Sequence, residues 1–159
     1  MALQFVEIPK DGKYGSSARE APPIVGDVVA AMTKLYAVAG YEHPWIGYLA
    51  LEDGVFVGTC GFKSPPEDDR VEIAYFTFPE HEARGIATDM ASKLIRVALD
   101  TNPDITVAAQ TLPEENASTS ILKKLNFACV DTIDHPEDGP VWEWQLRRDG
   151  RSYPIREIF

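Results

Sequence analysis

The sequence feature that most constrains the fold is a helical pattern at residues 85–99, which lies between two strand-like runs, residues 71–78 and 105–110. Apolar residues recur every three or four positions through the helical pattern, as they do in an amphipathic helix. The flanking runs are rich in β-branched, aromatic and small residues and are bounded by prolines, which is typical of strands. A strand, a helix and a strand of these lengths form a βαβ unit with parallel strands. We therefore predict an α/β fold.

Further strand-like runs predict antiparallel additions to this sheet. The pair Asp53-Gly54 separates two of them and is a strong signal for a hairpin turn. A loop with proline and glycine, residues 134–140, separates two more in a closing hairpin. The runs outside the βαβ unit are residues 3–8, 45–51, 55–63, 127–133 and 141–146. The prediction is a mixed, mostly antiparallel sheet of about six or seven strands around the parallel unit.

Two more helices are predicted, which places helices on both faces of the sheet. Pro22 and Pro23 begin the first, because proline fits a first helical turn, and Gly40 ends it. The second covers residues 117–125, and Asn126 follows where a left-handed cap residue is expected. Since no repeat or linker divides the sequence, we expect one domain over residues 1–159, with residues 148–159 as a C-terminal tail.

Charge and composition exclude several classes of function. Asp and Glu outnumber Lys and Arg by 25 to 15, which gives a net charge of -10 and argues against nucleic acid as a partner. No apolar run approaches the roughly 20 residues that span a bilayer, and no signal-peptide pattern begins the sequence. We expect a cytoplasmic protein without membrane association, in which Cys60 and Cys129 are reduced thiols and Cys60 is a core residue.

The chemistry concentrates between the strand at 71–78 and the helix at 85–99. Gly85 and the small residues around it allow backbone N–H groups at the helix start to approach an anion such as a pyrophosphate. A purely structural explanation, that Gly85 only eases a tight turn, accounts for these residues equally well. The segment lacks the Lys-Ser/Thr of a Walker loop and the three glycines of a dinucleotide fingerprint.

The segment Arg84-Gly85-Ile86-Ala87-Thr88 resembles the coenzyme A loop of the GNAT N-acetyltransferases, whose pattern is Gln/Arg-x-x-Gly-x-Gly/Ala. Glu82 departs from the Gln or Arg of the first position. Residues 71–75 resemble the Glu-Ile-Gly-Tyr strand of the branch that includes the ribosomal-protein N-terminal acetyltransferases. Residues 116–127 resemble that branch's Asn-x-x-Ser and Leu-x-Lys-Leu-Gly-Phe signature, with Asn126 in place of Gly and the Asn-to-Ser spacing one residue shorter.

The resemblance implies a GNAT fold and acetyl-CoA as co-substrate. It also implies that the strand before the loop pairs with the pantetheine arm and supplies an oxyanion-binding N–H. The implied cofactor-binding residues are Phe76, Thr77, Phe78, Glu82, Ala83, Arg84, Gly85, Ile86, Ala87, Thr88 and Asn116.

Two side chains are candidates for proton transfer. An alkyl amine with a pKa near 10.4 is neutral in only about one molecule in a few thousand at pH 7, so a base is needed. Glu72 is the candidate base, because it is the single charge in an apolar strand run; the structural alternative is a strand-end carboxylate paired with Arg70. No tyrosine follows between Phe127 and Val141 to protonate the thiolate, so the resemblance offers Ser118, whose structural alternative is a helix cap.

The interpretation is an N-acetyltransferase that acts by direct attack of a primary amine, from a small molecule or a protein N-terminus. A GNAT-fold module that binds acyl-CoA without chemistry and a scaffold protein are the competing hypotheses. His81 could touch phosphate but is more simply a solvated loop residue, and the spacing of His43 and His135 predicts no metal site. The closing hairpin offers an edge at which a homodimer could form.

Overall fold

The predicted βαβ unit is present at the centre of the molecule. In the computed structural model, which describes residues 3–16 and 20–148, it consists of β4 (Arg70–Thr77), α2 (Ile86–Thr101) and β5 (Thr106–Thr111). β4 and β5 are parallel neighbours, with Arg70 opposite Thr106 and Glu72 opposite Ala108. The remainder of the predicted tail, residues 149–159, lies outside the described residues.

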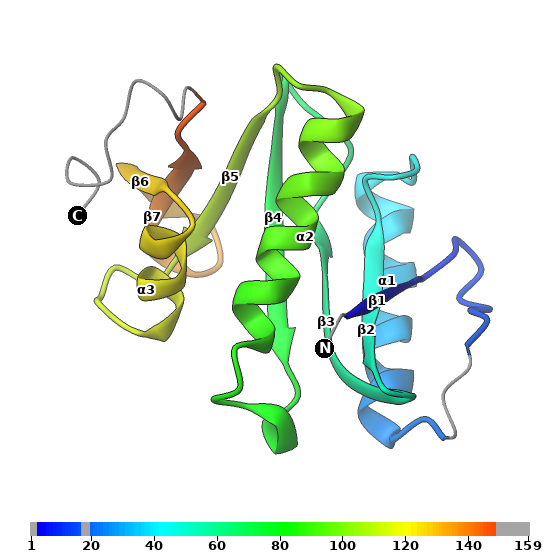
Figure 1. The fold of residues 1–159 in the computed structure, drawn as a ribbon. Coiled ribbons are helices and arrows are strands. Elements are labelled where there is room, and N and C mark those ends of the chain that lie inside the picture. The colour runs from blue at the N-terminus through cyan, green and yellow to red at the C-terminus, as the bar shows by residue number, and fades with distance from the viewer. Residues whose placement is uncertain (1–2, 17–19, 149–159) are drawn as a thin grey trace.

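The sheet has seven strands in the order β1-β2-β3-β4-β5-β7-β6 (Figure 1). All neighbouring pairs except β4 and β5 are antiparallel, which confirms the predicted mixed sheet. The turn between β2 and β3 is formed by Asp53 and Gly54, both with positive φ (53° and 79°), as an Asp-Gly hairpin requires. The other strands are β1 (Gln4–Glu7), β2 (Gly47–Glu52), β3 (Val55–Phe62), β6 (Phe127–His135) and β7 (Gly139–Leu146).

Helices cover both faces of the sheet. α2 and α3 (Ala117–Lys124) lie on the front face in Figure 1, and α1 (Pro23–Ala39) lies on the back face. Two glycines allow this close packing, because a Cβ on Gly47 would meet Met32 of α1 at 2.5 Å and one on Gly58 would meet Met90 of α2 at 3.0 Å. The largest fully buried side chains between these layers include Phe62, Phe127, Leu49, Ile73, Met90 and Leu94.

Tyr36 fixes α1 against the sheet. Its hydroxyl donates to the Ile8 carbonyl at 2.7 Å and accepts from the Gly47 N–H at 2.9 Å. Both partners are backbone groups beside β1 and β2, so one buried side chain satisfies a donor and an acceptor at once. The position of α1 over the back face is therefore defined by hydrogen bonds as well as by packing.

The closing hairpin is longer than the sequence predicted. β6 and β7 continue to pair through Asp134 with Pro140 and His135 with Gly139, so the predicted loop 134–140 is mostly strand. Proline is tolerated there because β5 pairs with β7 only as far as Trp142, and the missing N–H of Pro140 therefore costs no sheet bond. A short 3-10 turn, Pro79–His81, was also not predicted.

Candidate active site

β4 and β5 separate halfway along their length. They pair only from Arg70 to Glu72 on β4, although β4 continues to Thr77 and β5 to Thr111. On its other edge β4 remains paired with β3 as far as Thr77. Among residues 3–16 and 20–148, the second half of β4 therefore has one edge without a neighbouring strand.

The register with β3 identifies which backbone groups lie on this open edge. The Lys63 N–H donates to the Glu72 carbonyl and the Phe78 N–H donates to the Val57 carbonyl, both at 2.9 Å. Even-numbered residues therefore direct their backbone groups to β3, and the alternation of a strand directs those of Tyr75 and Thr77 to the open edge. These groups can pair with an extended ligand as a neighbouring strand would.

The start of α2 lies at the same end of the molecule. Ala83 and Gly85 both have positive φ, 63° and 78°, and Gly85 is the residue before the first helical turn. The first helical bond runs from the Asp89 N–H to the Gly85 carbonyl at 3.1 Å, so the N–H groups of residues 86–88 have no partner within the helix. Within the part of the chain that the structure describes, no side chain caps this helix start. Uncapped N–H groups at the positive end of a helix dipole are the features that favour an anion.

A cavity of about 570 Å³ joins the helix start to the open edge of β4. Gly85 leaves its wall open, because a Cβ added there would meet no atom within 4 Å. The structure thus brings together most of the residues that were predicted to form the site. Those that line the cavity are Phe76, Thr77, Glu82, Ala83, Gly85, Ile86, Ala87, Thr88 and Ser118, together with Tyr75, Ala117 and Ile121.

Three of the predicted contacts lie elsewhere. Arg84 turns away from the cavity: its guanidinium pairs with Glu52 at the end of β2 and lies 3.0 Å from Nδ1 of His81. Phe78 is 3% exposed, and its N–H is already bonded to the Val57 carbonyl. Asn116 borders an adjoining cavity of about 290 Å³ instead.

The start of α3 differs from that of α2 because it is capped. Asn116 Oδ1 accepts from the Thr119 N–H at 3.1 Å, and Thr119 Oγ1 accepts from the Asn116 N–H at 2.9 Å. This reciprocal pair is a capping box, so Asn116 and not Ser118 is the cap of this helix. Ser118, two residues after Asn116 in the first turn of α3, lines both the large cavity and the adjoining one.

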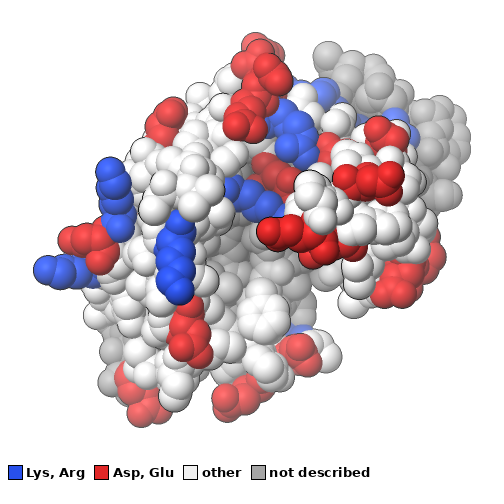
Figure 2. Space-filling model, turned by 180° about the vertical axis from the view of Figure 1, so that it is seen from behind, with Lys and Arg blue, Asp and Glu red and all other residues white. Residues whose placement is uncertain are grey.

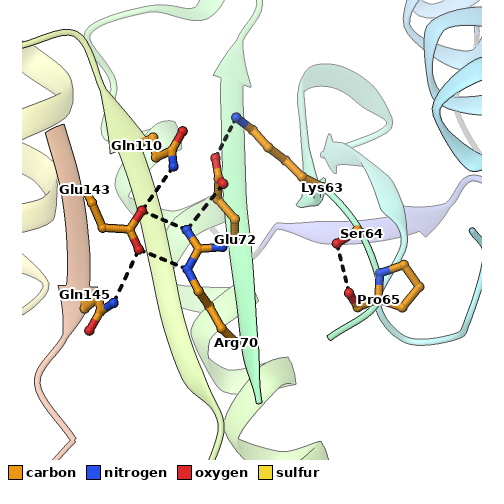
Figure 3. A network of polar contacts seen from close by, with 8 residues as sticks. All are labelled: Lys63, Ser64, Pro65, Arg70, Glu72, Gln110, Glu143 and Gln145. Atoms are coloured by element: carbon orange, nitrogen blue, oxygen red, sulfur yellow. Dashed lines mark hydrogen bonds and ion pairs between the residues drawn. The ribbon is translucent and has the colours of Figure 1, made fainter. Parts of the chain in front are cut away.

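Glu72 belongs to a charged network on the back face of the sheet (Figure 3). Its side chain is 12% exposed; Oε2 lies 2.6 Å from Lys63 Nζ and Oε1 lies 3.5 Å from Arg70 Nη2. The pairing with Arg70 agrees with the structural alternative, although Glu72 lies inside the strand and not at its end. Within the described chain, Glu72 lines neither the large cavity nor the adjoining one.

Arg70 links this network to β7. Its Nε and Nη2 donate to the two carboxylate oxygens of Glu143 at 2.9 and 2.8 Å. Gln110 and Gln145 also donate to Glu143, which is 4% exposed. Burial raises the pKa of Glu143, but the hydrogen bonds from Arg70, Gln110 and Gln145 outweigh it, so the pKa lies below its usual range.

Comparison with known proteins identifies the family. A family model described as the acetyltransferase (GNAT) domain matches residues 4–128, which is most of the chain and includes β4, the loop and α3. The chain belongs to the GNAT acetyltransferase family. The predicted fold and the predicted class of enzyme, an N-acetyltransferase, are thereby confirmed. No curated protein sequence matches significantly.

Solved structures agree with the GNAT fold at low sequence identity. The apo ribosomal L7/L12 alpha-N-protein acetyltransferase RimL superposes with a TM-score of 0.68 at 13% identity, over 94% of this chain and 96% of that one. A spermidine N-acetyltransferase SpeG chimera from Vibrio cholerae and hSSAT gives 0.67 at 10% identity, over 93% and 96%. YncA of Salmonella typhimurium, a putative acetyltransferase solved with acetyl-CoA, gives 0.62 at 17%, over 97% and 98%.

The sequence placed Tyr75 in the strand before the loop of this GNAT acetyltransferase but gave its side chain no role. Tyr75 borders the large cavity, the adjoining cavity and a third hollow on the back face. Burial raises its pKa to about 12, so its hydroxyl is protonated at neutral pH. A signal was available, because Tyr75 is the one side chain with a polar tip in the apolar run 73–76.

Three further observations concern Cys60, metal ligands and membrane-spanning helices in the GNAT domain. Cys60 is free and 4% exposed, and burial raises the pKa of its thiol well above the usual range, so it is a core residue as predicted. Among residues 3–16 and 20–148, no three His, Cys, Asp or Glu side chains gather as metal ligands would. None of the helices in that part of the chain is both long and apolar enough to cross a membrane.

Proposed function

We propose that this chain is an acetyl-CoA-dependent N-acetyltransferase that transfers the acetyl group to a primary amine by direct attack. The observation that carries the proposal is one cavity with two complementary walls, the uncapped start of α2 and the open edge of β4. A diphosphate with an extended amide-containing arm fits such a pair of walls. Bound acetyl-CoA would supply the activated acyl group as a thioester.

The backbone provides most of the binding groups in this proposal. The N–H groups of residues 86–88 and the positive end of the α2 dipole favour the diphosphate. The backbone groups of Tyr75 and Thr77 receive the pantetheine arm, and one N–H of this edge stabilises the oxyanion that develops during acyl transfer. Two solved structures of the same fold carry related ligands by name, YncA with acetyl-CoA and RimL with coenzyme A.

Side chains move the protons. We assign protonation of the departing thiolate to the Ser118 hydroxyl, because Ser118 lines both the large cavity and the adjoining one. Glu72 takes the amine proton through solvent, since its strand neighbours Ile73 and Ala74 line the adjoining cavity. Lys63 Nζ and Arg70 Nη2 form ion pairs with the Glu72 carboxylate, so both cations lie beside the proposed proton acceptor.

The acceptor is a small molecule or a protein N-terminus. RimL is named as an alpha-N-protein acetyltransferase and the SpeG chimera as a spermidine N-acetyltransferase, and both share this fold. The fold therefore accommodates both classes of amine.

The decisive experiment measures acetyl-CoA binding by calorimetry and thiol release in the presence of amines. Gly85→Glu places a carboxylate in the phosphate position and should abolish measurable binding. Gly139→Glu is the matched control, because Gly139 also has positive φ (73°) and open space around its Cβ but is the first residue of β7. Equal binding by wild type and Gly85→Glu would refute the proposal.

A further inference from the structure

A third hollow, of about 370 Å³, lies on the back face of β4. Met32 and Leu35 of α1 form one side of it, and Ala74 and Phe76 of β4 form another. Figure 2 shows this face of the molecule hollowed between two parts, with basic and acidic side chains meeting at one end of a largely uncharged surface. Its size is within the range of small-molecule sites.

The chemistry of this hollow is apolar. Leu35 is half-buried and Phe76 is 47% exposed, so both present carbon atoms that a ligand could cover. Lys63 is the one charged side chain among its lining residues, and its Nζ is already paired with Glu72. No carboxylate lines the hollow in the described part of the chain, so it offers no partner to a second ammonium group.

The hollow adjoins the proposed acetyl-CoA cavity. Tyr75 and Phe76 border both. The adjoining cavity makes a second connection, because it shares Lys63 and Ala74 with the hollow and Ser118 with the large cavity. A molecule seated under α1 can thus extend an amine past Tyr75 toward Ser118.

We infer that the acceptor is a primary amine carried on an apolar aliphatic or aromatic body, with the body in the hollow under α1. This inference rests on the proposed function. The amine nitrogen bonds to the acetyl carbonyl carbon, and the carbon–sulfur bond breaks. The amine loses a proton and the thiolate gains one, which gives an N-acetylamine and the free thiol. Polyamines and sugar amines fit this hollow poorly, because their second charge or hydroxyl groups would lose water without gaining partners.

The test compares two amines of equal chain length, hexylamine and hexane-1,6-diamine, with purified full chain and acetyl-CoA. We expect kcat/KM, measured by thiol release, to be higher for hexylamine by roughly tenfold or more. Equal values, or preference for the diamine, would overturn the inference while leaving the transferase activity established. Binding of acetyl-CoA with acetylation of only polyamines or amino sugars would overturn it too. Absence of acetyl-CoA binding would instead refute the proposed function.

Two substitutions on α1 locate the site. Leu35→Glu should raise KM for hexylamine about tenfold and narrow the preference over the diamine, with unchanged acetyl-CoA affinity. Val38→Glu is the matched control, because Val38 is on the same helix but 89% exposed, and it should change neither. If the glutamate variant does not fold, Leu35→Ala is the milder substitute. It should raise KM for hexylamine about threefold or more. Unchanged KM in a folded Leu35 variant would place the acceptor elsewhere and contradict the inference.

Discussion

Arg70 on β4 and Glu143 on β7 form a bidentate ion pair across β5, the strand between them. Ala108 of β5 lies between the two strands, opposite Glu72 on β4 and Gln145 on β7 in the register. Because its side chain is only a methyl group, the longer side chains of Arg70 and Glu143 have room to meet over β5. The pair lies beside the last paired residues of β4 and β5. It therefore holds the two halves of the sheet together where they begin to separate.

Removing the two partners should have unequal effects on stability. Arg70→Met leaves the almost fully buried Glu143 carboxylate without its cation, which should cost about 3 kcal/mol. Glu143→Gln leaves Arg70, whose side chain is 33% exposed and can be hydrated, so the cost should be about 1 kcal/mol. Urea unfolding measures both. In the double variant the two costs should not add, and simple additivity would show that the pair has no coupling.

The same carboxylate predicts an acid-sensitive component of stability. The folded-state pKa of Glu143 lies below its ordinary value of 4.5, so its contribution is fully present above pH 4.5. It is lost as the pH falls from 4.5 through the folded-state pKa, because the unfolded chain takes up the proton first. Thermal melting from pH 7 to pH 3 should show a steeper loss for wild type than for Glu143→Gln. Parallel curves would contradict this assignment.

Glu72→Gln should separate a base from a structural carboxylate. As the base, Glu72 would contribute about a hundredfold to kcat at pH 7, the lower end for such catalysis. The deficit of the variant should shrink toward pH 10, where about a quarter of an amine with a pKa near 10.4 is neutral without help. Full kcat at pH 7 with a lower melting temperature would instead mean that Glu72 only anchors Lys63 and Arg70.

Ser118→Ala tests the proposed proton donor. We expect kcat to fall about a hundredfold while acetyl-CoA affinity and stability stay near wild type, because Asn116 and not Ser118 caps the helix. Ser120→Ala on the same helix is the control, since Ser120 is exposed and lines neither cavity. Equal turnover by the two variants would remove Ser118 from the mechanism.

Glu82→Gln should strengthen acetyl-CoA binding. Glu82 lines the large cavity with a negative charge, and the nearby Arg84 is occupied by Glu52 and His81. Removing one repulsive charge beside a diphosphate should lower the dissociation constant by about threefold to tenfold, more at low salt. Glu80→Gln removes an equal charge from the neighbouring 3-10 turn outside the cavity wall. Calorimetry that finds the same change in both variants would indicate only a general charge effect.

Local patterns predicted the parts of this structure that local interactions determine. The Asp53-Gly54 turn, the left-handed Asn126 (φ 76°) and the glycine at the start of α2 each follow from the conformations that a few residues can adopt. The family model also confirms the fold that these patterns suggested. Such features need no knowledge of distant segments.

The features that were missed depend on register between distant strands. The Arg70–Glu143 pair appears only once strand order is known, because its two residues lie far apart in sequence. The extra length of β6 and β7 was not predicted because proline is typical of turns. Its place in β7 is explained only once it is known that β5 does not pair with β7 at Pro140.

The early end of the β4–β5 ladder has a consequence for how such a protein can change over time. Backbone donors and acceptors on the free margin of β4 are the same whatever side chains the strand carries. Substitutions at residues 73–77 would therefore change the side chains around the proposed acceptor site, while the backbone groups proposed to bind acetyl-CoA stay the same. Recognition by backbone groups would let related proteins acetylate different amines while they keep the same acyl donor.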